Sequence, residues 1–135
     1  GSEKNAIAPN KRMLSSMSPT IVEENGKLRM VIGTPGGSTI ITSVLQCMLN
    51  VFEYGMTMQE SVSQPRFHHQ WLPDDVMFEP KGFDPAVIAK LKAKGYVPKE
   101  ENFVIIGRVD AILVEKDGTL EGGADPRGDD VAEGY

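Results

Sequence analysis

From residue 31 to residue 52 the chain reads VIGTPGGSTIITSVLQCMLNVF. The β-prone segment Leu28 to Ile32 leads into a turn that is centred on Gly36 and Gly37. From Thr39 to Phe52 the apolar residues recur at helical spacing. They fall into two neighbouring rows, one of Ile40, Val44 and Met48 and one of Ile41, Leu45, Leu49 and Phe52. The stretch therefore predicts a strand, a tight turn and a buried helix.

The turn at Gly36 and Gly37 has two interpretations. Glycine leaves the backbone N–H uncovered by a Cβ, and the first turn of a helix has unpaired N–H donors. Such a place can bind an anion, or can stabilise an oxyanion that develops during acyl transfer. In the alternative, the segment is a plain structural turn and Ser38 only caps the helix. The motif alone leaves both open.

Length and composition describe an ordinary globular chain. Its 135 residues suffice for one domain, and 40% hydrophobic and 24% charged residues are usual for a soluble protein. With 14 Lys and Arg against 19 Asp and Glu, the net charge of −5 argues against a nucleic-acid partner. No apolar run approaches the ~20 residues of a membrane span. Gly1-Ser2 is typical of an expression-tag remnant, which leaves residues 3–135 as a single domain.

The remaining pattern predicts an α+β fold of mostly antiparallel strands with packed helices. Thr20–Glu23 and Leu28–Ile32 form a hairpin around an Asn25-Gly26 turn. Further helices are expected at 56–63 and from Asp84-Pro85 to Gly95, the latter with Val87, Ile88 and Leu91 as its core face. Further strands are expected at 76–79, 96–99, 103–106 and 111–115 and around residue 120.

The hairpin suggests a site. Counted back from its turn, Ser15 and Ser16 fall at the same end of the ribbon as Gly36 and Gly37. Two hydroxyls beside two free amides can bind a carboxylate on one side and stabilise an oxyanion on the other. A serine nucleophile would need a neighbouring general base, and the chain offers no obvious one. The pattern indicates the receiving half of an acyl-transfer site.

Other reactive residues favour structural roles. His68 and His69 are adjacent in an extended segment and point to opposite sides, so they do not easily share a metal ion. We expect no metal and no cofactor. The lone Cys47 lies among apolar helix residues, which indicates a core position and rules out an internal disulfide. Asp125 and Arg127 are expected to form a local ion pair, worth little if exposed.

Four motifs resemble the small subunit of γ-glutamyltransferases (γ-glutamyltranspeptidases), in order and over nearly the whole chain. They are KRMLSSMSPTIV at 11–22, GTPGGS at 33–38, PRFHHQWLP at 65–73 and GADPR at 123–127. The resemblance implies part of an αββα sandwich of the N-terminal-nucleophile hydrolases. It implies cleavage of γ-glutamyl bonds, as in glutathione, with transfer of the acyl group to water, an amino acid or a peptide.

Residue roles follow from the same resemblance. Ser15 and Ser16 would hold the α-carboxylate of the γ-glutamyl group, and Gly36 and Gly37 would supply the oxyanion hole. The family's nucleophile is a threonine freed at the start of the small subunit by self-cleavage, but no threonine precedes Thr20 here. We therefore expect a C-terminal portion that lacks the nucleophile, the first part of the small subunit and the large subunit. Such a chain would be inactive alone.

Two further expectations accompany this interpretation. An excised part of a sandwich would expose apolar area and a strand edge, which favours self-association. A periplasmic or extracellular location is implied by the resemblance only. Two departures from the family pattern stand out, Met13 in place of a proline and Gly107-Arg108-Val109-Asp110 in place of Gly-Ser-x-Gln. The alternatives to the enzyme fragment are a non-catalytic small-anion binding module and an inert scaffold segment.

Overall fold

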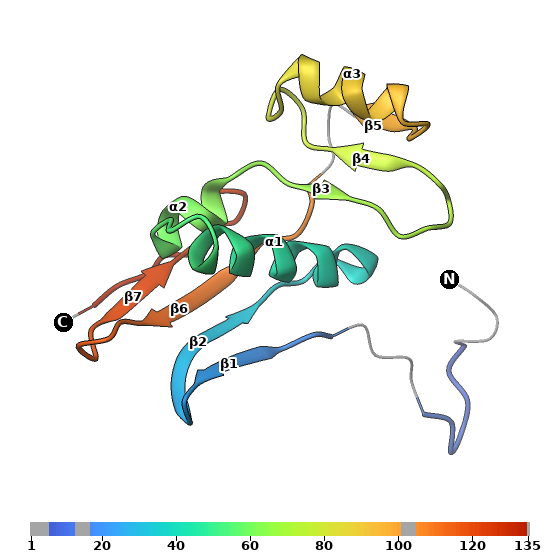
Figure 1. Cartoon of the computed structure of the whole chain (residues 1–135). Helices are drawn as coiled ribbons and strands as arrows, with labels where there is room; N and C mark the ends of the chain where they lie inside the picture. Colours follow the sequence, from blue (N-terminus) through green and yellow to red (C-terminus); the bar gives the residue numbers. More distant parts are fainter. Residues whose placement is uncertain (1–5, 13–16, 101–104, 135) are drawn as a thin grey trace.

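The computed structural model describes residues 6–12, 17–100 and 105–134. In chain order its elements are β1 (Thr20–Glu24), β2 (Lys27–Gly33), the 3₁₀ turn η2 (Gly37–Thr39), α1 (Ile40–Phe52), α2 (Met58–Ser63), β3 (Phe67–His68), β4 (Val76–Phe78), α3 (Pro85–Ala93), β5 (Pro98–Glu100), β6 (Asp110–Val114) and β7 (Leu120–Gly123). The strands form a four-stranded antiparallel sheet, β1-β2-β6-β7, and a three-stranded sheet, β3-β4-β5. Helices α1 and α2 lie over one face of the larger sheet, and α3 lies beside the smaller one (Figure 1).

The predicted α+β class with mostly antiparallel strands is confirmed, with one exception. Strands β4 and β5 pair in parallel, connected through α3. The predicted strand at 96–99 is found slightly later, as β5. Of the predicted strand at 103–106, Ile105 and Ile106 lie outside any strand, and the two residues before them lie outside the described residues.

The first hairpin forms where turn chemistry predicted it. Asn25 and Gly26 both have positive φ, 53° and 74°, which is the backbone that a two-residue hairpin turn requires. The pairing sets Thr20 opposite Ile32, with a bulge after Val22. The second hairpin joins β6 to β7 through a turn in which Gly118 has φ of 92°.

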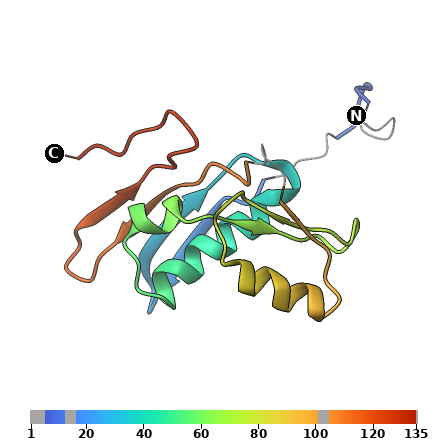
Figure 2. The same ribbon diagram turned by 90° about the horizontal axis from the view of Figure 1, so that it is seen from above.

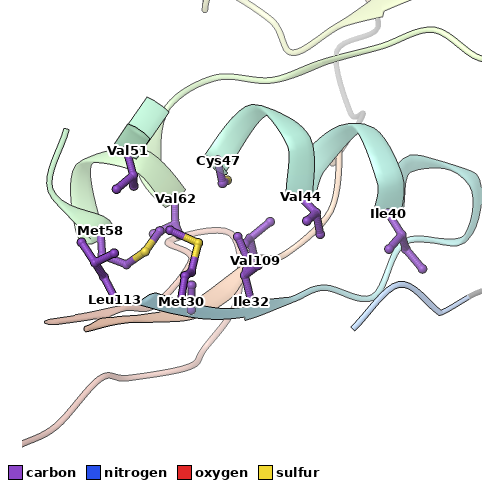
Figure 3. Packing of buried hydrophobic residues seen from close by; sticks show 11 residues of the cluster. Met30, Ile32, Ile40, Val44, Cys47, Val51, Met58, Val62, Val109 and Leu113 are labelled. Atoms are coloured by element: carbon purple, nitrogen blue, oxygen red, sulfur yellow. The ribbon is translucent and has the colours of Figure 1, made fainter. Parts of the chain in front are cut away.

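The core lies between α1, α2 and the larger sheet (Figure 3). Strand residues alternate, so that Met30 and Ile32 of β2 and Leu113 of β6 point toward the helices. The cluster consists of Met30, Ile32, Ile40, Val44, Cys47, Val51, Met58, Val62, Val109, Ala111 and Leu113. The core position predicted for Cys47 is confirmed, because its side chain is fully buried.

One of the two apolar rows of α1 is not buried. The helix rests on the sheet through the first predicted row, in which Ile40 and Val44 are buried and Met48 is partly buried, and through the neighbouring Cys47 and Val51. The second predicted row, Ile41, Leu45, Leu49 and Phe52, is 40–68% exposed. The burial predicted for this row is wrong for the described chain, because a single sheet face covers only one side of a helix. Seen from above, α3 lies to one side of α1 (Figure 2).

The helix starts also differ in detail. Ser38 does not cap α1, because a 3₁₀ turn precedes the helix and its carbonyls satisfy the donors instead, with Thr39 N–H bonded to Gly36 O at 3.2 Å. Helix α2 begins at Met58, after a capping box between Thr57 and Glu60.

Helix α3 begins as predicted. Its N-cap Asp84 accepts a hydrogen bond from the Ala86 N–H at 2.8 Å, and Pro85 occupies the first helical position. The predicted core face is correct only in part, since Ile88 and Leu91 are half-buried and Val87 is exposed. The reason is that only the short smaller sheet lies beneath this helix.

The other face of the larger sheet is open. Ile21, Val31 and Ile112 lie in register across β1, β2 and β6 and are 67%, 43% and 48% exposed. Leu120 of β7 adds to this surface and is 65% exposed. Among the described residues, no helix is both long and apolar enough to pass through a membrane. Apolar side chains are therefore exposed in two places, along the outer row of α1 and on the face of the larger sheet that points away from the helices.

Candidate functional site

The Gly36–Gly37 segment, called the glycine turn below, joins β2 to α1. Both glycines are exposed, with φ of 147° and 59°. Their carbonyls accept hydrogen bonds from the Thr39 and Ile40 N–H groups, which closes the turn. Neither glycine N–H donates to a described residue. Among the residues that the structure describes, the turn therefore presents two adjacent N–H donors without a partner at the N-terminal end of α1, where the helix dipole favours negative charge.

The two glycines are required for different reasons. A Cβ on Gly36 would lie 2.6 Å from Thr39 Oγ1 and 3.5 Å from Gly107 Cα, and its φ is one that L-residues rarely adopt. A Cβ on Gly37 would meet nothing within 4 Å. Gly36 is thus packed against its surroundings, whereas Gly37 faces open space from which a ligand can approach.

Behind the glycine turn lies the segment Ile106–Val109, called the support segment below. Its Arg108 N–H donates to Thr34 Oγ1 at 2.7 Å, and Gly107 lies against Gly36. A Cβ on Gly107 would approach Ser43 Oγ to 2.7 Å and Thr34 Oγ1 to 3.0 Å, so the contact requires glycine. The support segment thus bonds to Thr34, just before the glycine turn, and would be met by a Cβ on Gly36.

A buried charge network anchors the support segment. It consists of Arg66, Glu79, Asp125 and Arg127. Arg66 Nη1 lies 2.7 Å from Asp125 Oδ2, and the two side chains are 1% and 0% exposed. Arg127 bridges Asp125 Oδ1 at 3.0 Å and Glu79 Oε2 at 2.5 Å. The predicted Asp125–Arg127 pair is confirmed, and it is largely buried rather than exposed. Both arginines also donate to the Val62 carbonyl near the C-terminal end of α2.

Sequence reasoning missed this network. Arg66 and Glu79 were not candidates, because ion pairs between segments far apart in the sequence leave no spacing signal. A usable signal was present only in the resemblance, since Arg66 and the pair Asp125 and Arg127 all stand within its motifs.

Two members of the network, Asp125 and Arg127, are favoured in their ionised forms. Burial of the Asp125 carboxyl opposes ionisation, but hydrogen bonds from Val109 and Arg127 and the charge of Arg66 outweigh it, so its pKa lies below its usual value. Burial likewise opposes the charge on Arg127, but its hydrogen bonds to Glu79 and Asp125 raise the pKa of its guanidinium.

The lowered pKa of Asp125 predicts that the folded protein loses stability in acid. A carboxylate with a lowered pKa contributes stability that is fully present above its ordinary pKa of 3.8 and is lost as the pH falls through the lower folded value. We expect the unfolding temperature to fall on acidification below about pH 4, and the Asp125→Asn variant to lack this part of the fall. Calorimetric scans of both proteins between about pH 6 and pH 2 measure it. Parallel pH profiles would contradict it.

The histidines are held by protein partners. His68 is buried, with Nδ1 2.7 Å from Thr42 Oγ1 and Nε2 3.0 Å from Gln70 Oε1. His69 points to the other side and lies 3.0 Å from Asp74 Oδ1. Within the described ranges, no group of three or more His, Cys, Asp or Glu side chains is arranged to hold a metal ion. Burial raises the pKa of the Cys47 thiol, which keeps it protonated.

Ser15, Ser16 and Met13 lie outside the described residues. The position of Ser15 and Ser16 beside the glycine turn stays a prediction. The register of β1 and β2, with Thr20 opposite Ile32, makes the chain before β1 and the chain after β2 leave the hairpin at the same end.

A hollow over the open sheet face is separate from the glycine turn. Val31, Ile112 and Leu120 line it from the sheet, and Val131 and Ala132 of the C-terminal tail lie across it. Neither glycine of the turn contributes to this hollow. This hollow is therefore not part of the glycine turn's surface.

Comparison with known proteins gives one consistent family. A family model described as "Gamma-glutamyltranspeptidase" matches residues 1–135. The chain is 50% identical over 137 residues to the glutathione hydrolase proenzyme of Escherichia coli K12, covering all of this chain and 23% of that protein. The chain therefore spans less than a quarter of this relative's length.

Solved structures agree with this match. The γ-glutamyltranspeptidase of Pseudomonas nitroreducens in complex with L-DON matches with a TM-score of 0.84 and 41% identity, over all of this chain and 70% of that one. A mutant of the Helicobacter pylori γ-glutamyltranspeptidase matches with a TM-score of 0.82 and 46% identity, over 95% of this chain and 69% of that one.

Proposed function

Because this chain belongs to the γ-glutamyltranspeptidase family, we propose that it supplies the receiving half of a γ-glutamyl transfer site. In this role the N–H groups of Gly36 and Gly37 stabilise the oxyanion, and Ser15 and Ser16 bind the substrate's α-carboxylate. The threonine nucleophile, the rest of the small subunit and the large subunit belong to the full-length protein.

The proposed reaction has two steps. The threonine oxygen attacks the γ-glutamyl carbonyl, the amide C–N bond breaks, and the proton of the threonine hydroxyl goes to the leaving amine. Water or an acceptor amine then attacks the acyl ester and gives a proton back to the threonine oxygen, which frees the threonine hydroxyl. In both steps the carbonyl oxygen carries negative charge, and donors that bind it more strongly in the transition state raise the rate. The observation that carries the proposal is the pair of adjacent N–H groups at Gly36 and Gly37, neither of which donates to any residue that the structure describes; a Cβ on Gly37 would meet none of these residues within 4 Å.

Hydrolysis of a chromogenic γ-glutamyl anilide tests this function. We expect no turnover by the chain alone, and turnover when the missing precursor segments are supplied in trans or in the full-length protein. Turnover by the chain alone would reveal a nucleophile within it and overturn the proposed mechanism. Binding of phosphate by the chain without preference for glutamate would instead favour the anion-binding module.

We further propose that the full-length protein has the αββα arrangement, and the exposed apolar surfaces of this chain support that proposal. The open sheet face would pack on a second sheet, and the exposed row of α1 on a neighbouring element, both supplied by the rest of the protein. Strand β1, at one edge of the larger sheet, would be a further contact.

Without these neighbours we expect the chain to self-associate, because an exposed apolar face of this kind favours contact between copies. Light scattering over a wide concentration range measures it. The double change Val31→Lys and Ile112→Lys should shift the chain toward monomer, while Glu23→Lys, at an exposed polar position of the same sheet, should not. A wild-type chain that stays monomeric at all concentrations would contradict this expectation.

A further inference from the structure

We propose that Thr34 and Thr39 are positioning residues that aim the two N–H groups of the glycine turn. This inference rests on the proposed function, because it explains how the oxyanion donors are held. It follows from which carbonyl each threonine hydroxyl contacts, and from the planarity of the peptide bond.

Thr34 controls the peptide unit that carries the Gly36 N–H. Its hydroxyl donates to Pro35 O at 2.7 Å. The Pro35 carbonyl and the Gly36 N–H belong to one planar trans unit, in which C=O and N–H point in opposite directions. Fixing the Pro35 oxygen on one side therefore directs the Gly36 N–H to the other.

Thr39 controls the next peptide unit in the same way. Its Oγ1 donates to Gly36 O at 3.0 Å, and its own N–H donates to the same oxygen at 3.2 Å. The Gly36 carbonyl shares its peptide plane with the Gly37 N–H. Each donor of the turn thus has one threonine hydroxyl on the opposite end of its peptide unit. Glycine needs this restraint more than other residues, because its backbone is otherwise free to rotate.

Thr34 is itself fixed from outside the turn. Its oxygen accepts from the Arg108 N–H at 2.7 Å while its proton goes to Pro35 O. Serine can make the same two bonds, whereas valine, of nearly the same shape, can make neither.

The support segment is in turn held by charged side chains rather than by a strand partner. Ile106 O accepts from Arg66 Nη1 at 3.0 Å, and the Val109 N–H donates to Asp125 Oδ2 at 2.7 Å. Glu79 Oε1 accepts the Ile106 N–H at 3.2 Å. The charge network therefore fixes the anchor for Thr34, and Thr34 transmits that position to the glycine turn.

The test uses the full-length protein and the variants Thr34→Val, Thr34→Ser, Thr39→Val and Thr39→Ser. We expect each valine variant to lower kcat for γ-glutamyl anilide hydrolysis about tenfold, with KM within about twofold, because misaimed donors weaken transition-state binding only. The serine variants should restore kcat to within about threefold of wild type. If a valine variant does not fold, the alanine variant, which also lacks the hydroxyl, replaces it.

Thr42→Val is the matched control. Its hydroxyl bonds to His68 Nδ1 at 2.7 Å and to Thr39 O at 3.1 Å, and it touches neither peptide unit of the turn. We expect its kcat to stay within about twofold of wild type. Valine variants at 34 and 39 with unchanged kcat, or an equal loss in the control, would overturn the inference.

Amide chemical shifts separate this inference from the proposed function. In protein labelled with ¹⁵N-glycine, Thr34→Val should move the Gly36 amide signal and Thr39→Val the Gly37 signal, while both serine variants leave them in place. A protein that shows these shifts but hydrolyses no γ-glutamyl anilide would refute the function and leave the positioning role intact. Unmoved signals would refute the positioning role whatever the activity.

Discussion

Replacing Gly36 with alanine in the full-length protein is expected to lower kcat for γ-glutamyl hydrolysis by about 100-fold or more. The added Cβ would lie 2.6 Å from Thr39 Oγ1, at a φ of 147° that alanine rarely adopts. The turn must therefore shift. A shift displaces both N–H groups, and the loss of a single oxyanion donor already costs about 10²–10³ in kcat.

Gly26→Ala is the control for this variant. Gly26 also has a positive φ, 74°, and a Cβ there would meet nothing within 4 Å, in the hairpin turn at the other end of β2. The strain of a left-handed alanine, about 1–2 kcal/mol, is then present without any effect on the glycine turn. Activity is measured on protein that has undergone self-cleavage, so that loss of processing is not counted as loss of catalysis. More than a tenth of wild-type kcat in Gly36→Ala would contradict the role of this turn.

The second large effect is on stability. Asp125→Asn is expected to destabilise the protein by about 3–5 kcal/mol, because it leaves the Arg66 charge buried without its counter-charge. Asparagine has the same size, so no cavity forms, and its one oxygen can still accept the Val109 N–H. Its NH2 group then faces the Arg127 donors that Asp125 Oδ1 accepts, so the loss reports the charge together with one acceptor. The measurement is the shift of the denaturation midpoint of the full-length protein.

Asp75→Asn gives the matched comparison. Asp75 Oδ2 lies 2.7 Å from Lys99 Nζ, the same separation as in the Arg66–Asp125 pair, but these side chains are 24% and 46% exposed. A pair open to solvent contributes about 0–1 kcal/mol. Equal shifts in the two variants would mean that burial of the charge network does not matter for stability.

The local elements of this fold follow from local signals. Asn25-Gly26 sets the first hairpin turn because both residues readily adopt positive φ. Asp84-Pro85 starts α3 because Asp84 caps the helix and the fixed φ of Pro85 suits its first position. Which side of α1 is buried could not be predicted, since both apolar rows are plausible and only the position of the sheet selects one. The parallel pairing of β4 with β5 likewise depends on contacts made after a long connection.

The candidate site, like the fold, was predictable in its local features but not in its contacts between segments. Gly36 and Gly37 stand out in the sequence because two glycines precede a helical repeat. Gly107 gave no such signal, since its need for glycine comes from Ser43 and Thr34 in other elements. The aim of the two N–H groups depends on hydroxyl contacts of about 3 Å, which no sequence pattern encodes.

The most direct measurement is a crystal structure of the full-length protein with a γ-glutamyl analogue bound covalently to its nucleophile. The proposed site predicts that the oxygen of the former carbonyl lies about 2.7–3.1 Å from the nitrogens of both Gly36 and Gly37, with the α-carboxylate on the hydroxyls of Ser15 and Ser16. An oxygen that points away from the glycine turn, or a carboxylate held elsewhere, would contradict it.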